Sequence, residues 1–85
     1  MVLSLHLVQV QFMTFTVMAS SLGQRMRQRR EALGISRHKV AVATGVTENS
    51  VINWESDKHV PTLPPRQIAA LLKALQWEFK DLVEE

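Results

Sequence analysis

The 85-residue chain contains no cysteine, so neither a disulfide bond nor a cysteine-bound zinc ion can add to the stability of its core. It also lacks a glycine-rich phosphate loop. Its three histidines, His6, His38 and His59, have no carboxylate or second histidine at metal-ligand or catalytic-triad spacing, and we expect His38 and His59 on the surface. The sequence therefore predicts one small domain that is not an enzyme, holds no metal or cofactor, and is stabilised by apolar burial.

Residues 1–20 contain no acid, lysine or arginine and are rich in residues that favour extended structure. The segment is short for a transmembrane helix and is interrupted by His6, Gln9 and Gln11. It lacks the positive start of a secretory signal, so we expect no association with a membrane. Three interpretations stay open: a poorly packed arm, a strand that pairs with another chain, or an upstream extension whose natural start is Met18. We assign the segment no function and expect the domain to span residues 21–85.

The net charge of +2 is small but unevenly distributed. Basic residues gather in the first half of the domain with only Glu31 among them, namely Arg25, Arg27, Arg29, Arg30, Arg37 and Lys39. Acids dominate the C-terminal end, where Lys80 stands among Glu78, Asp81, Glu84 and Glu85. This asymmetry predicts one basic and one acidic face. The alternative is a solvated helix surface that binds nothing.

Hydroxyl residues and glycines divide the first part of the domain into three short helices. Ser21–Gln24 matches a capping box, and Ser36 and Thr47 are candidate N-caps of the second and third helices. Gly34 and Gly45 close the first two, because glycine accepts the left-handed backbone. Apolar periodicity then predicts the inward faces, formed by Leu22, Met26, Ala32 and Leu33, by Val40, Ala41 and Thr44, and by Val51 and Trp54.

The second part of the domain begins with a loop over residues 56–63, after which Pro64 and Pro65 start a further helix. Its apolar stripe continues without a glycine or proline to the end of the chain, through Ile68, Leu71, Leu72, Leu75, Phe79, Leu82 and Val83. We predict two helices with a joint at Gln76-Trp77, with one long helix as the alternative. The fold class is therefore all-α, with four to five short helices around one core.

Two charges of opposite sign interrupt the inward faces. Arg30 lies between Met26 and Leu33, and Glu55 lies beside Trp54. Because a buried charge needs a partner, we predict that Arg30 and Glu55 form a buried ion pair. In the alternative, both side chains bend out to solvent.

Residues 21–83 resemble the lambda-repressor-like, Xre/Cro-type helix-turn-helix family through three motifs, "LGQRMRQRREALGIS", "HKVAVATGVTENSVINWES" and "PTLPPRQIAALLKAL". The helix-turn-helix unit would span residues 36–55. The resemblance implies a cytoplasmic, five-helix transcription regulator that binds operator DNA as a homodimer. The chain departs from the family at Asp57, which replaces a glycine, at Pro64, which replaces a hydroxyl cap, and at Gln76 and Glu78, which replace a glycine and a cap.

The resemblance also implies that the helix over residues 48–55 enters the major groove. Its candidate base contacts are Glu48, Asn49, Ser50 and Asn53, with Asn49 first because an amide pairs bidentately with adenine. This helix has no lysine or arginine, so phosphate contacts must come from flanking residues, for which Arg37, Arg25, Arg29 and Lys58 are candidates. Glu48 opposes DNA binding, and we expect at most about three to five phosphate contacts per subunit.

The sequence leaves several functions open. Within the class of DNA-binding regulators, a free repressor and an antitoxin that represses its own operon fit equally well. A protein-interaction module with the same fold is the rival, because the third helix carries no basic residue. Its partner would be a protein such as a toxin or another regulator.

Overall fold

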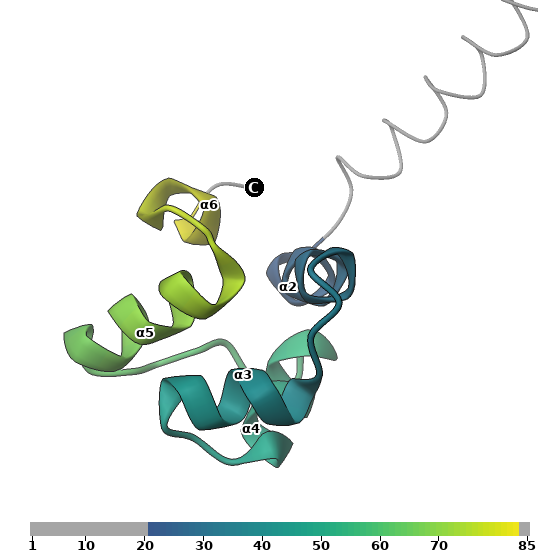
Figure 1. Cartoon of the computed structure of the whole chain (residues 1–85), viewed down its shortest axis with the longest axis horizontal. Helices are drawn as coiled ribbons and strands as arrows, with labels where there is room; N and C mark the ends of the chain where they lie inside the picture. The colour runs from purple at the N-terminus through teal and green to yellow at the C-terminus, as the bar shows by residue number, and fades with distance from the viewer. Residues whose placement is uncertain (1–20, 84–85) are drawn as a thin grey trace, which may run out of the picture.

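Five helices form the part of the chain that the computed structural model describes, residues 21–83. Figure 1 shows them in order: α2 (Leu22–Ala32), α3 (Arg37–Thr44), α4 (Glu48–Glu55), α5 (Pro65–Leu75) and α6 (Phe79–Val83). No strand occurs between residues 21 and 83. The predicted all-α fold is thus confirmed, while the three interpretations of residues 1–20 concern a segment outside the described residues.

The helix starts lie where the hydroxyl residues predicted them. Ser21 and Gln24 form the reciprocal capping box of α2, with the Gln24 N–H donating to the Ser21 hydroxyl at 3.2 Å. Ser36 and Thr47 cap α3 and α4, accepting from the backbone three residues on at 3.0 and 3.1 Å. Each hydroxyl oxygen accepts from a backbone N–H that has no partner inside its own helix. The N-terminal boundaries of these helices were therefore predictable from single residues.

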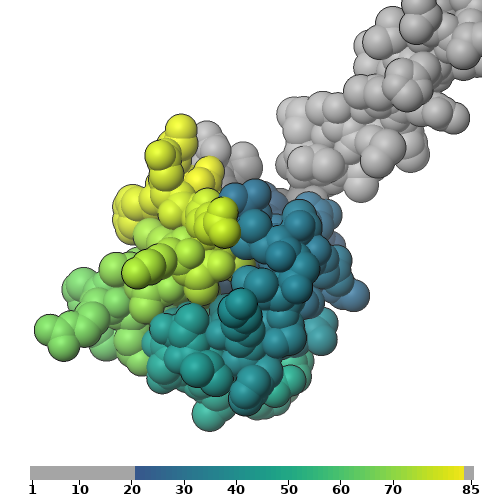
Figure 2. Space-filling model, in the orientation of Figure 1, coloured from purple at the N-terminus to yellow at the C-terminus, as the bar shows by residue number. Residues whose placement is uncertain are grey.

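The core lies between the helices and contains seven buried apolar side chains: Met26, Val40, Ala41, Val51, Trp54, Leu71 and Leu75. Figure 2 shows α6 on the outside of the domain, where it rests against α5 and α2. The prediction for Ala32 was wrong, because its side chain is exposed. Successive residues of a helix are rotated by about 100° about its axis. Ala32 therefore lies at the edge of the inward face, while the next residue, Leu33, is half-buried.

The turn between α3 and α4 depends on Gly45, which has a φ of 83° at the C-cap of α3. Gln67 of α5 completes this turn, since its side-chain amide donates to the carbonyls of Thr44 at 3.3 Å and Gly45 at 3.1 Å. These bonds satisfy carbonyls at the end of α3 that have no partner within the helix. The angle between α3 and α4 is therefore fixed both by the glycine and by α5.

The helices α2 and α4 are closely packed at Gly23. A Cβ atom at this position would collide with the carbonyl oxygen of Trp54 and with the Asp57 carboxylate. Gly23 is buried, and a larger residue would push the two helices apart. This glycine was not singled out by the sequence pattern, because the neighbour that requires it is more than thirty residues away in the chain.

The joint between α5 and α6 confirms the prediction of two helices. Leu75 ends α5, and Gln76 follows at a φ of 53°, in the left-handed region where a glycine is more usual. Pro64 provides no side-chain cap for α5, because proline has no side-chain oxygen. The helix α6 has no buried residue, so its position depends on contacts other than an apolar core.

The two inward-facing charges form a closely packed ion pair. Arg30 Nε and Nη2 donate to the two carboxylate oxygens of Glu55 at 2.7 and 3.3 Å, and Nη1 donates to the Ile35 carbonyl at 2.9 Å. Arg37 adds a third contact to Glu55, from its Nε at 2.9 Å. Both residues of the pair are 8% exposed. One carboxylate on α4 thus holds the side chains of two arginines, one from α2 and one from the first turn of α3.

We expect Arg30→Met to lower the free energy of unfolding by about 3 kcal/mol, because it leaves the buried Glu55 carboxylate with only one cationic partner. The measurement is urea denaturation of the variant beside Arg27→Met. Arg27 forms an exposed pair with Glu31 at 3.1 Å, whose loss should cost less than about 0.5 kcal/mol. Equal losses in the two variants would contradict a stabilising role for the buried pair.

Candidate nucleic-acid interface

The outer face of α4 carries the four residues predicted to read bases. Glu48 and Asn49 are exposed, and Ser50 and Asn53 are half-buried. The inner face of the same helix holds Val51, Trp54 and Glu55 in the core. The helix is thereby anchored along one side, while Asn49 and the adjacent polar groups point outward. The structure thus brings the predicted base-contact residues onto one accessible surface.

The N-terminal end of α4 is polar and is linked to α3. The Ser50 hydroxyl lies 3.0 Å from the Thr47 hydroxyl, so part of its hydrogen-bonding capacity is used within the helix cap. The Glu48 carboxylate lies 3.7 Å from Nδ1 of His38, and both side chains are more than half exposed. His38 offsets the charge of Glu48 only when its imidazole is protonated. The first turn of α4 is therefore neutral to acidic, as its composition predicted.

Arg37 lies at the first position of α3, next to the N-cap Ser36. Its Nε donates to Glu55, and its side chain is 36% exposed. The structure therefore gives Arg37 an internal partner that the sequence analysis did not foresee. The terminal nitrogens lie beyond the Nε that binds Glu55. The predicted phosphate contact of Arg37 remains a prediction, now from a side chain held in place by Glu55.

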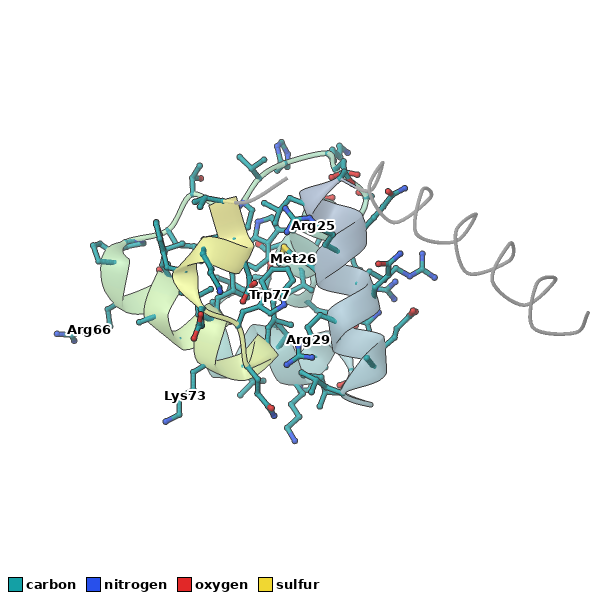
Figure 3. The ribbon with its side chains drawn as sticks, turned by 90° about the horizontal axis from the view of Figure 1, so that it is seen from above. Arg25, Met26, Arg29, Arg66, Lys73 and Trp77 are labelled. Atoms are coloured by element: carbon teal, nitrogen blue, oxygen red, sulfur yellow. The ribbon has the colours of Figure 1, made fainter. Side chains whose placement is uncertain are left out.

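Arg25 and Arg29 face the C-terminal helices, as Figure 3 shows. Arg29 donates to the carbonyls of Leu75 at 2.9 Å and Gln76 at 3.1 Å, where α5 ends. Arg25 donates to the Asp81 carbonyl at 2.7 Å and lies over the ring of Trp77, 5.9 Å from its centroid. These donors would have to leave their carbonyls to reach a phosphate. The expected basic face is therefore largely used inside the molecule.

The loop after α4 is held against that helix and against α2. The Asn53 carbonyl accepts from the backbone N–H groups of Lys58 at 2.9 Å and His59 at 3.2 Å. The Asp57 carboxylate accepts from the Ser21 hydroxyl and from the Gly23 N–H at 3.1 Å, which adds a negative charge at the start of α2. Lys58 is exposed and follows directly. The departure from glycine at position 57 thus has a structural reason.

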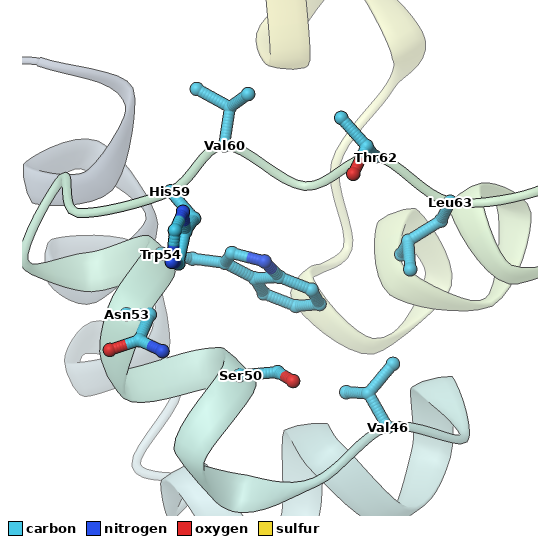
Figure 4. A pocket seen from close by; sticks show the side chains of 8 residues that line it. All are labelled: Val46, Ser50, Asn53, Trp54, His59, Val60, Thr62 and Leu63. Atoms are coloured by element: carbon cyan, nitrogen blue, oxygen red, sulfur yellow. The ribbon is translucent and has the colours of Figure 1, made fainter.

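A hollow of about 370 Å³ lies beside α4, which the sequence analysis did not predict. Figure 4 shows the eight residues that line it, contributed by α4, the turn before it and the loop after it: Val46, Ser50, Asn53, Trp54, His59, Val60, Thr62 and Leu63. His59 and Thr62 therefore join the surface that contains Asn53. No periodic signal in the sequence could have found them, because they lie in an irregular loop.

Two further findings concern the described residues alone. Between residues 21 and 83, no cluster of three or more metal-ligating side chains occurs. In the same part of the chain, no helix has the length and apolar character needed to cross a membrane.

The comparisons with known proteins agree with this geometry. The family model for the helix-turn-helix domain matches residues 21–85, so the chain belongs to that family, and its fold is lambda-repressor-like. A similar solved structure is that of the P22 c2 repressor protein in complex with a synthetic operator. The TM-score is 0.69 at 29% sequence identity, over 78% of this chain and 97% of the repressor chain. No curated protein gives a significant match.

The Asp57 contacts generate a stability prediction. Asp57 has a φ of 64°, so Asp57→Ala removes the hydrogen bonds of its carboxylate to the start of α2 and also strains the turn. We expect a loss of about 2–3 kcal/mol, the sum of about 1–2 for the carboxylate bonds at the start of α2 and about 1 for the left-handed backbone. Asp57→Gly removes only the carboxylate bonds, because glycine accepts the left-handed backbone, and this variant should lose less stability. Thermal unfolding of both variants checks this; an Asp57→Gly protein that is the less stable of the two would contradict it.

Proposed function

We propose that this protein is a sequence-specific DNA-binding transcription regulator that reads the major groove with α4. The observation that carries the proposal is the outward polar face of α4, held by the buried Trp54 and Glu55 on its other side. The operator complex of the P22 c2 repressor, a chain similar over most of its length, supports the same use of this fold. A regulator of this kind would work in the cytoplasm, where the DNA lies.

In this proposal, the two asparagines carry most of the base recognition. Asn49 is exposed in the first turn, and Asn53 follows one turn later on the same side. An asparagine amide both donates to and accepts from adenine in the major groove. Glu48 would accept from a cytosine amino group, and Ser50 would contact a base or a phosphate. The exposed Ile52 supplies an apolar contact for a thymine methyl group.

The side chains of two of the four predicted phosphate contacts donate to no backbone carbonyl in the described domain. Lys58 is exposed beside the C-terminal end of α4, and Arg37 lies at the N-terminus of α3, where the helix dipole also attracts an anion. Arg25 and Arg29 contribute only if they release the carbonyls at the ends of α5 and α6. Because each neutralised phosphate adds about 0.9 to the slope of log affinity against log salt, the proposed interface has a shallow salt dependence.

We also infer that the protein acts as a homodimer, with α6 in the interface. Phe79 and Val83 lie one turn apart on α6 and are 62% and 60% exposed. Together they present an apolar strip that no residue of the described domain covers. Large apolar side chains in such an unpaired row favour burial against a second surface.

The first test selects bound duplexes from a random pool and then compares variants on the recovered sequence. We expect Asn49→Ala to weaken binding about tenfold or more, because it removes a bidentate base contact. Glu48→Gln, at the adjacent position, should instead tighten binding, since it removes a negative charge near the phosphates. Gln28→Ala, at an exposed site on α2, should have no effect. Recovery of no duplex by wild type or by Glu48→Gln would favour a protein-interaction module.

The second test addresses the dimer. We expect Phe79→Asp to shift the dissociation of the dimer to higher protein concentration, because a carboxylate would be buried in the apolar interface. Analytical ultracentrifugation of the full chain over a range of concentrations measures the change. Lys73→Asp, an exposed charge change on α5, is the matched control. Identical monomer–dimer curves for wild type and Phe79→Asp would show that α6 does not form the interface.

A further inference from the structure

The hollow beside α4 has a buried hydrogen-bond donor at its floor. Trp54 is only 5% exposed, and its indole ring forms part of the lining. Figure 4 shows the indole nitrogen on the edge of the ring that faces Val60 and Thr62. A buried tryptophan usually pairs its N–H with an acceptor. Among the side-chain hydrogen bonds of the described domain, including those of the adjoining Thr47, Ser50 and Ser56, none involves this group.

The indole N–H is nevertheless open to the hollow rather than sealed in the core. Among the described residues, the fully buried side-chain nitrogen and oxygen atoms without a partner are Arg25 Nε and Thr44 Oγ1, and the indole nitrogen is not one of them. The ring belongs to the same buried core cluster as Met26 and Val51, which restricts its movement. The structure thus holds a donor in a fixed direction at the bottom of an accessible site.

The polar residues in the remaining lining suit an anionic oxygen. None of the eight lining residues carries a carboxylate. Thr62 and His59 add a hydroxyl and an imidazole at the rim, and both can donate a hydrogen bond. The exposed cation Lys58 directly precedes His59, and the backbone of both residues is tied to the Asn53 carbonyl. A site that offers donors, no acid and a neighbouring cation matches a phosphate oxygen.

The position of the hollow identifies the source of that phosphate. Ser50 and Asn53 belong both to the lining and to the proposed base-reading face of α4. A duplex with its bases against Asn49 and Asn53 would therefore bring one strand of its backbone to the rim. We propose that this hollow binds one phosphate of the DNA backbone, with the Trp54 indole N–H as its buried donor and Thr62 and His59 as its outer donors. The inference rests on the proposed DNA-binding function.

The test uses the two tryptophans of the chain, whose indole N–H groups give two resonances in the nitrogen–proton spectrum of the labelled full-length protein. On addition of the duplex selected by the wild type, we expect the Trp54 indole resonance to move downfield. The Trp77 resonance should stay in place, because that ring lies against Arg25. A methylphosphonate replaces one charged phosphate with a neutral group. In a series of duplexes that each carry one methylphosphonate at a different position, we expect the Trp54 shift to disappear at one position.

A substitution at the rim of the hollow tests whether the Trp54 shift reports a contact that contributes to affinity for the duplex. Thr62→Val removes one rim donor at an exposed site, so the fold should persist, and we expect affinity to fall about threefold to tenfold. The difference in affinity between wild type and Thr62→Val should vanish on the duplex whose methylphosphonate abolishes the Trp54 shift. Inorganic phosphate alone is the second probe: a Trp54 shift with phosphate but not with the duplex would overturn the assignment to the DNA backbone.

The outcomes separate the two proposals. If the side-chain amides of Asn49 and Asn53 respond to the duplex while the Trp54 indole does not, this inference fails and the DNA-binding function stands. If no resonance responds to any selected duplex, both fail. A Trp54 shift that every methylphosphonate duplex still produces would also overturn the inference, because it would report a change in packing rather than contact with a phosphate.

Discussion

The arrangement of the first three helices depends on the hydrogen bonds that two arginines donate to the Glu55 carboxylate. Arg30 reaches it from α2 and Arg37 from the start of α3, while Arg30 also binds the Ile35 carbonyl in the turn between them. Because Arg30 and Glu55 are buried, an arrangement that left either of them unpaired would be costly. The network therefore admits one orientation of α4 relative to α2 and α3. The direction in which Asn49 points follows from that orientation.

The arginines explain why two of the four predicted phosphate contacts are occupied inside the molecule. Arg29 satisfies the carbonyls at the end of α5, and Arg25 binds both a carbonyl of α6 and the face of Trp77. Each performs structural work that an apolar residue could not, since α5 ends without a glycine and α6 buries no side chain. Recognition of DNA would then depend on neutral amides and on donors held in position, more than on overall charge.

The sequence predicted those features that local rules control. The caps Ser21, Ser36 and Thr47 and the turn glycine Gly45 set helix boundaries through neighbours within four residues, and apolar periodicity placed most of the core. The Arg30–Glu55 pair was predictable because two opposite charges fell on inward faces. Long-range partners were not. An arginine is long enough to reach many acceptors, so the carbonyl partners of Arg25 and Arg29, the second arginine on Glu55 and the hollow beside Trp54 appear only once the helices are packed.

The attachment of α6 makes the angle of this helix independent of the residues of α4 that face the groove. Arg25 binds a carbonyl of this last helix and the ring of Trp77, which precedes it, and no residue of α6 enters the core that fixes α4. Its angle can consequently change during evolution while the groove-facing chemistry stays the same. In a symmetric pair joined through this helix, such a change would alter the distance between the two half-sites, and hence which palindromes fit, without any substitution among the residues that touch a base.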